Sequence, residues 1–217
     1  MFFHKHPYDP YIKANTETLI VGTLPPPRFT TGELIKQDVD FCYGSYYNSL
    51  WLYIDKIHNL GLDFENTHRA IEQRKNFLIA NKIGVCDIVD SCERDKIDAS
   101  DLGMKNIQLR NLINYLKQFP TVHTLLFTGG NSKNGPEYFF RKHLKDHNLK
   151  LEVVSDIVPR IHQFKLNDRI IKTVSLTSPS GSANRAIGSM ELYKKMKKEN
   201  SKFTTFDFRV LQYQKWF

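Results

Sequence analysis

The chain has 217 residues, of which 41% are hydrophobic and 25% charged, so it can build an apolar core and is not a disordered chain. Its net charge of +8 favours a polyanionic partner, such as nucleic acid or an anionic membrane surface, although a solvated basic surface without a specific partner remains open. No apolar run approaches the roughly 18 residues of a membrane span. Three cysteines without a CxxC pair indicate a reduced, cytoplasmic protein that holds no thiolate cluster.

Strand and helix patterns alternate along the chain. Short apolar runs that end in glycine, proline or polar residues predict buried strands, and apolar residues at helical spacing predict helices. In chain order these are strand 19–23, helix 50–57, strand 83–89, helix 109–116, strand 122–127, helix 136–144, strand 171–177 and helix 190–196. This alternation predicts an α/β fold with a parallel sheet covered by helices on both faces.

Two segments depart from the simple alternation. Asn167-Asp168 is typical of a hairpin turn between residues 161–166 and 170–176. Residues 203–217 are expected to form a weakly structured tail that its aromatic residues hold against the body. We therefore expect one domain over residues 1–202 followed by this tail.

The residues that follow the four predicted strands are small, turn-forming or polar. They are GTLPPPRF after the first strand, Cys86-Asp87 with the second, Thr128-Gly129-Gly130 after the third and TSPSGSANR after the fourth. Ligands of open α/β sheets bind outside the carboxyl ends of the strands, and glycine allows a ligand to approach the backbone closely. A ligand site is therefore expected at this edge, although such residues also terminate strands for purely structural reasons.

Six stretches in the right order resemble the uracil-DNA glycosylase superfamily, most of all its mismatch-specific (thymine/uracil) and hypoxanthine-type branches. The two signature loops are similar to GTLPP at 22–26 and SPSGSANR at 178–185. The other similar stretches are HPYDPYI at 6–12, YGSYYNSLW at 43–51, and IGVCDIVDSCER at 83–94 together with LLFTGG at 125–130. The resemblance covers about residues 4–195.

The resemblance implies a three-layer αβα sandwich around a central four-stranded parallel sheet. It also implies a monofunctional DNA N-glycosylase of base excision repair, which flips a deaminated base, uracil or hypoxanthine, out of DNA and hydrolyses its bond to deoxyribose. The expected partner is double- or single-stranded DNA, bound by a monomer that needs no cofactor and no metal, and not a membrane. In a bacterium the protein would be associated with the nucleoid.

The same resemblance supplies candidate site residues. Tyr43 stands where an aromatic ring stacks on the base, and Asn48 could hold the attacking water through its amide carbonyl. Asp87 could orient water or stabilise an oxocarbenium-like sugar. The remaining base-binding candidates are Gly22, Thr23, Leu24, Pro25, Thr128 and Gly129. The DNA-binding candidates are Arg28, Ser178, Pro179, Ser180, Gly181, Ser182, Asn184 and Arg185.

Each candidate also has a structural interpretation. Tyr43 could be a core tyrosine, Asn48 a helix N-cap, Asp87 part of a solvated acidic loop, and the 178–185 segment a capping loop. Three residues differ from those that relatives use: Leu24 replaces a water-activating asparagine of the mismatch-specific branch, Thr128 a base-reading asparagine and Ser182 a bulky leucine. A catalytically silent nucleic-acid or nucleobase-binding module, or a hydrolase of free nucleosides, therefore remains an alternative.

Overall fold

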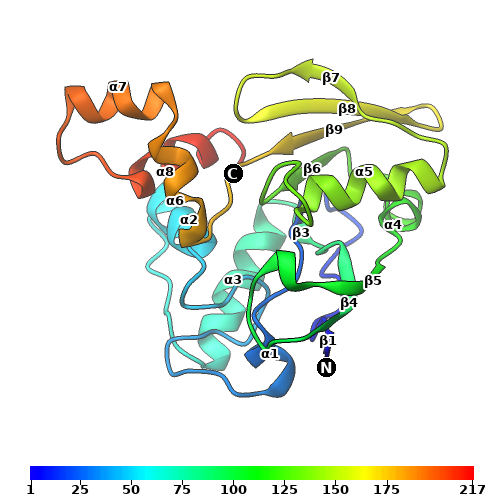
Figure 1. Ribbon diagram of the computed structural model, residues 1–217, viewed down its shortest axis with the longest axis horizontal. Coiled ribbons are helices and arrows are strands. Elements are labelled where there is room, and N and C mark those ends of the chain that lie inside the picture. The colour runs from blue at the N-terminus through cyan, green and yellow to red at the C-terminus, as the bar shows by residue number, and fades with distance from the viewer.

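A six-stranded, mostly parallel sheet forms the centre of the computed structural model, which describes residues 1–217 (Figure 1). Its strands, in spatial order, are β3 (Ile83–Val85), β2 (Thr18–Val21), β6 (Thr124–Phe127), β9 (Arg169–Ser175), β8 (Arg160–Leu166) and β7 (Glu152–Ser155). The first four run parallel, and β8 and β7 extend them in antiparallel pairing. The sheet therefore has six strands, two more than the four expected from the sequence.

The extra strands follow from the hairpin at Asn167-Asp168. Leu166 pairs with Arg169 across this two-residue turn, and Asn167 adopts the left-handed φ of 55° that asparagine tolerates better than most residues. Phe164 and Leu166 of β8 are buried, so the added hairpin contributes to the core. The hairpin predicted from the sequence is confirmed.

Helices cover both faces of the sheet, because successive strand residues point to opposite sides. On β2, Leu19 and Val21 belong to one hydrophobic cluster and Ile20 to another. The first cluster includes residues of α4 (Leu112–Gln118) and α5 (Pro136–Asp146), and the second includes residues of α2 (Leu50–His58), α3 (His68–Ala80) and α8 (Thr205–Tyr213). Three layers result, with helices on either side of the sheet.

The predicted strand 83–89 is in fact two strands in different sheets. Strand β3 ends at Val85, and β4 (Val89–Arg94) pairs with β1 (Phe2–Lys5) and β5 (Lys105–Leu109) in a separate antiparallel sheet. The three residues between β3 and β4 make the turn that carries Asp87. Because Leu109 ends β5, the predicted helix 109–116 begins only at Leu112.

The C-terminal residues form a regular helix and not the weakly structured tail expected from the sequence. Thr204 and Asp207 cap α8 reciprocally, which satisfies backbone donors at its first turn. The ring of Tyr53 on α2 lies 5.1 Å from that of Phe206 and 5.0 Å from that of Tyr213. These aromatic contacts hold α8 against α2.

The remaining helices are short: α1 (Pro27–Thr31), α6 (Asn184–Gly188) and α7 (Glu191–Glu199). No helix combines the length and apolar character that crossing a membrane requires.

One buried histidine makes the stability of this fold depend on pH. His4 on β1 is fully buried and its Nδ1 accepts a hydrogen bond from Arg94 Nε at 2.9 Å. Burial, with the neighbouring Arg94 and His6, lowers the pKa of His4 to about 4. The folded protein therefore resists the protonation that the unfolded chain undergoes near pH 6.5.

Acidification from pH 7 to pH 4 should cost the wild type about 3 kcal/mol of unfolding free energy through His4, because the unfolded state binds the proton first. His4→Gln keeps an acceptor for Arg94 but does not titrate, so its stability relative to wild type should rise by that amount. Denaturant unfolding at both pH values measures the difference. His68→Gln, at an exposed imidazole, is the control. If the unfolding free energies of His4→Gln and the wild type differ by the same amount at pH 7 and at pH 4, the prediction is wrong.

Candidate functional site

A single cavity of about 810 Å³ lies where all four parallel strands end. Gly22 follows β2, Asp87 follows β3, Thr128 follows β6 and Ser178 follows β9, and all four residues line it. The carboxyl ends of parallel strands meet at one edge of the sheet, which brings these distant segments together. The predicted site residues that line the cavity are Gly22, Thr23, Leu24, Pro25, Tyr43, Asn48, Asp87, Thr128, Ser178, Pro179, Ser180 and Ser182.

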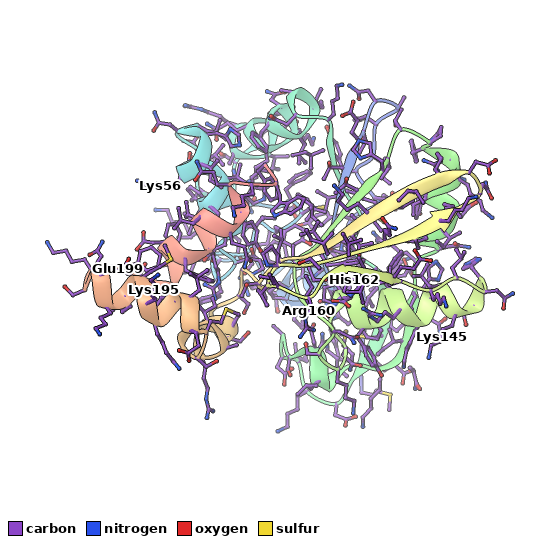
Figure 2. All side chains as sticks on the ribbon, turned by 90° about the horizontal axis from the view of Figure 1, so that it is seen from above. Lys56, Lys145, Arg160, His162, Lys195 and Glu199 are labelled. Atoms are coloured by element: carbon purple, nitrogen blue, oxygen red, sulfur yellow. The ribbon has the colours of Figure 1, made fainter.

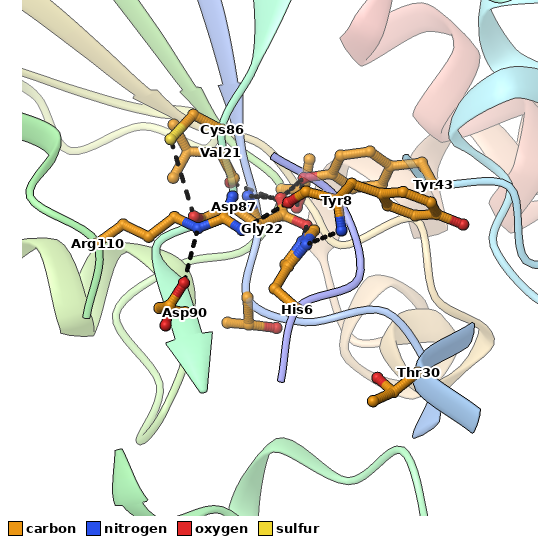
Figure 3. Close-up of polar contacts among 12 residues, drawn as sticks. His6, Tyr8, Val21, Gly22, Thr30, Tyr43, Cys86, Asp87, Asp90 and Arg110 are labelled. Carbon is orange, nitrogen blue, oxygen red and sulfur yellow. Dashed lines mark hydrogen bonds and ion pairs between the residues drawn. The ribbon is translucent and has the colours of Figure 1, made fainter. Parts of the chain in front are cut away.

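Asp87 is the centre of a buried hydrogen-bond cluster at one wall of this cavity (Figure 3). Its Oδ1 accepts from the backbone N–H of Gly22 at 2.7 Å and from the hydroxyl of Tyr43 at 2.8 Å. Its Oδ2 lies 3.0 Å from Nε2 of His6. Because His6 Nδ1 accepts from the backbone N–H of Tyr8, Nε2 carries the proton that is donated to Asp87. Three donors thus compensate the buried carboxylate, which is 6% exposed and not part of a solvated acidic loop.

This cluster fixes the aromatic ring expected to stack on a base. Tyr43 has a positive φ of 59°, a costly conformation for an aromatic residue that persists only where neighbours enforce it. Its hydroxyl also lies 3.2 Å from Thr128 Oγ1. Burial and the nearby Asp87 raise the pKa of Tyr43 well above its usual range, so the phenol stays protonated and can donate.

Asn48 lies at the cavity, directly before Ser49, the N-cap residue of α2. Its Oδ1 accepts the backbone N–H of Leu50, the first residue of α2, at 2.9 Å. Its backbone forms a β-bridge with Ser180, and the next residue, Ser49, donates to Pro179 O at 3.1 Å. The two loops that resemble the superfamily signatures at 43–51 and 178–185 are therefore joined directly through their backbones.

A residue of the C-terminal helix α8 holds the 178–185 loop through hydrogen bonds. Arg209 on α8 is buried, and its guanidinium donates to Ser180 O at 3.2 Å, to Asn184 Oδ1 at 2.9 Å and to Tyr53 Oη at 3.1 Å. Within the loop, the hydroxyl of Ser180 accepts from the backbone N–H of Ser182. The loop is held in one shape by a residue that lies outside every sequence motif.

Five predicted site residues do not line the cavity. Arg28, expected to contact phosphate, instead forms a two-point ion pair with buried Asp38 at 2.7 Å and also donates to Ser45. Gly129 is buried beside Pro136, and Asn184 accepts from Arg209. Gly181 and Arg185 are exposed next to the cavity-lining part of the loop.

Sequence reasoning missed three residues of the site. His6 belongs to the HPYDPYI stretch but had no role assigned, Arg209 lies in the supposed tail, and Asp101 lies in a polar stretch without a motif. Asp101 lines the cavity and its carboxyl accepts from the hydroxyl of Thr23 at 2.9 Å. Burial, together with nearby Asp87, raises the pKa of Asp101 to about 6, against the lowering effects of Thr23 and Arg94. A carboxyl that titrates near neutral pH is suited to proton transfer.

No cluster of three or more His, Cys, Asp or Glu side chains in the structure is arranged to hold a metal ion.

Comparison with known proteins yields one similar structure. No family model matches the chain, and no curated protein matches its sequence. The solution NMR structure of a protein from Methanosarcina acetivorans, provisionally named a uracil DNA glycosylase, superposes with a TM-score of 0.53 at 16% sequence identity. The match covers 96% of this chain and 99% of that one. The chain therefore shares the fold of that protein over nearly its whole length.

The close packing around Gly22 gives a direct test of the cavity wall. A Cβ at this position would lie 2.8 Å from Asp87 Oδ1 and 3.0 Å from Thr128 Oγ1, and closer still to the hydroxyl of Tyr43. Gly22→Ala should therefore lower the unfolding free energy by about 1–3 kcal/mol, measured by denaturant unfolding. At Gly181 the same change meets nothing within 4 Å, so Gly181→Ala should change stability by less than about 0.5 kcal/mol. Equal effects of the two substitutions would show that the cluster does not constrain Gly22.

Proposed function

We propose that the chain is a monofunctional DNA N-glycosylase that hydrolyses the bond between deoxyribose and a deaminated base, uracil or hypoxanthine, flipped out of DNA. The observation that carries this proposal is the gathering of Gly22, Tyr43, Asn48, Asp87 and Ser180 around one cavity. These residues come from four segments that each resemble the superfamily. The overall similarity to the Methanosarcina protein supports the same fold and, more weakly, the same class of activity.

The cavity offers the groups that an extrahelical base needs. Its wall is the turn of residues 22–25, whose backbone can contact the edge of the base, and Tyr43 supplies an aromatic face. The hydroxyl of Thr128 can both donate and accept a hydrogen bond. Thr128 is held by Tyr43, which links the edge-reading group to the stacking ring.

In this proposal Asn48 holds the attacking water, and Asp87 acts as a positioning residue. The carbonyl of Asn48 has a second lone pair beyond the one used by Leu50, and its amide NH2 makes no hydrogen bond within the protein. Asp87 already receives three hydrogen bonds and is best suited to fix Tyr43 and the turn at Gly22.

The basic residues near the 178–185 loop are the proposed contacts for DNA phosphates. Arg185 is exposed at the start of α6, and Lys195 projects from α7 (Figure 2). Lys194 is paired with Glu191, and Lys197 donates to backbone carbonyls of residues 201 and 203. Exposed lysines without a carboxylate partner are the ones available to replace the counterions of DNA.

A catalytically silent nucleobase-binding module is the second candidate function. It is favoured by the hydrogen bond from Leu50 to Asn48, which occupies part of the amide that catalysis would use, and by Leu24, which cannot activate water.

The decisive experiment incubates the purified protein with single- and double-stranded oligonucleotides that contain uracil, hypoxanthine or xanthine, followed by alkali to cleave abasic sites. We expect cleavage that depends on alkali. Strand cleavage without alkali would indicate a lyase and would point to Lys133, which also lines the cavity. Salt-dependent DNA binding without any abasic product would select the silent binding module.

Asn48→Ser separates the two roles of Asn48. A serine hydroxyl can also accept a backbone N–H two residues further along the chain, so the unfolding free energy should change little, whereas the loss of the amide should lower single-turnover cleavage by about 10²-fold or more with little change in DNA affinity. Asn111→Ser is the matched control, because Asn111 caps α4 through Asn114 and does not line the cavity. If Asn48→Ser retains wild-type cleavage, Asn48 does not hold the water.

A further inference from the structure

The cavity contains a second carboxyl group whose surroundings differ from those of Asp87. Asp101 begins a single 3-10 turn, Asp101–Gly103, between β4 and β5. Its Oδ1 accepts from Thr23, a residue of the turn proposed to contact the base, while Oδ2 makes no hydrogen bond within the protein. One oxygen is thus tethered to the base-binding turn and the other is free to face a ligand in the cavity.

The backbone around Asp101 is anchored by two buried side chains. Asn134 donates through Nδ2 to the carbonyl of Asp101 at 2.9 Å, and Arg94 donates through Nη1 to the carbonyl of Ser100 at 2.6 Å. Asn134 and Arg94 are 6% and 1% exposed. Proton transfer requires a donor fixed within hydrogen-bond reach of its acceptor, and these anchors provide a fixed position.

The charged and polar groups around Asp101 differ from those around Asp87. Burial and the like charge of Asp87 favour its protonated form, which Arg94 and the Thr23 hydrogen bond oppose, and the resulting pKa is about 6. Asp98 and Lys133 are the other charged residues that line the cavity. Asp87 accepts three hydrogen bonds and Asp101 one, so the two carboxyl groups are suited to opposite roles, a held carboxylate and a proton donor.

We infer that Asp101 is the general acid of this site, which protonates a ring nitrogen of the departing base; the inference rests on the proposed glycosylase function. The bond between C1′ and the base nitrogen breaks, and its electron pair leaves with the base. The proton of Asp101 passes to the base, so that the base departs neutral. The oxygen of water forms the new bond to C1′, and the proton lost by that water restores the acid form of Asp101 through solvent.

This role distinguishes the candidate bases. A purine joined to the sugar through N9 still has unprotonated ring nitrogens, N7 and N3, whereas uracil joined through N1 carries hydrogen on its other ring nitrogen. The acid should therefore matter for a deaminated purine more than for uracil.

The test is the pH dependence of single-turnover cleavage between pH 5 and 8, on oligonucleotides that contain hypoxanthine or uracil. With hypoxanthine, the wild-type rate should be level below about pH 6 and fall about tenfold per unit above it, as the acid form disappears. Asp101→Asn can still accept from Thr23 but cannot donate a carboxyl proton. Its rate at pH 5.5 should fall about 10²-fold and lose this pH dependence, with less than about threefold loss on uracil. Thr23→Val removes a hydrogen bond that lowers the pKa, so the break in the profile should move to higher pH.

Asp95→Asn is the matched control, since Asp95 lies in the same connection but is exposed, pairs with Lys105 and does not line the cavity. It should keep the wild-type profile. A wild-type profile for Asp101→Asn, or equal losses on both bases, would overturn the role of Asp101 while leaving the glycosylase function intact. If the wild type cleaves none of the bases, the proposed function fails and this inference fails with it.

Discussion

The structure of the site depends on how one buried carboxylate is compensated. Asp87 is 6% exposed, and a charge in that position is stable only if donors surround it. The donors come from the N-terminal segment through His6, from the end of β2 through Gly22 and from the 43–51 loop through Tyr43. Satisfying Asp87 therefore forces three remote segments to meet at the carboxyl edge of the sheet and gives the cavity its wall.

A second set of hydrogen bonds holds another part of the cavity lining. Arg209 joins the C-terminal helix to Ser180, Asn184 and Tyr53, and the backbone contact between Asn48 and Ser180 connects this side to the loop that carries Tyr43. Both sets of hydrogen bonds fix residues that line one cavity, so a base in it would meet groups that are already oriented. Preorganised donors and rings are what a site that binds a flipped base requires.

The sequence predicted the parallel strands and most of the helices that flank them, because those elements are short apolar runs that end in turn-forming residues or have clear helical spacing. Twelve of the seventeen residues predicted for the site line the cavity, since turn residues after parallel strands must gather at one edge. The sequence did not predict β1, β4 and β5, because their polar and apolar residues follow no clear strand pattern. It also mistook α8 for a tail, because much of the stability of so short a helix comes from packing of Phe206 and Tyr213 against Tyr53.

The sequence by itself determined the class of fold, the edge of the sheet at which the cavity lies and the identity of the aromatic and amide residues that line it. It also supplied the charge of +8. Only the tertiary structure decided which charged groups are free. Arg28 is paired with Asp38, Asp87 accepts from three donors, and Asp101 keeps one carboxyl oxygen without a hydrogen bond to the protein. Hydrogen-bond partners and burial set the protonation state of an ionisable group. Both depend on segments that lie far apart in the chain, so no local sequence pattern reveals them.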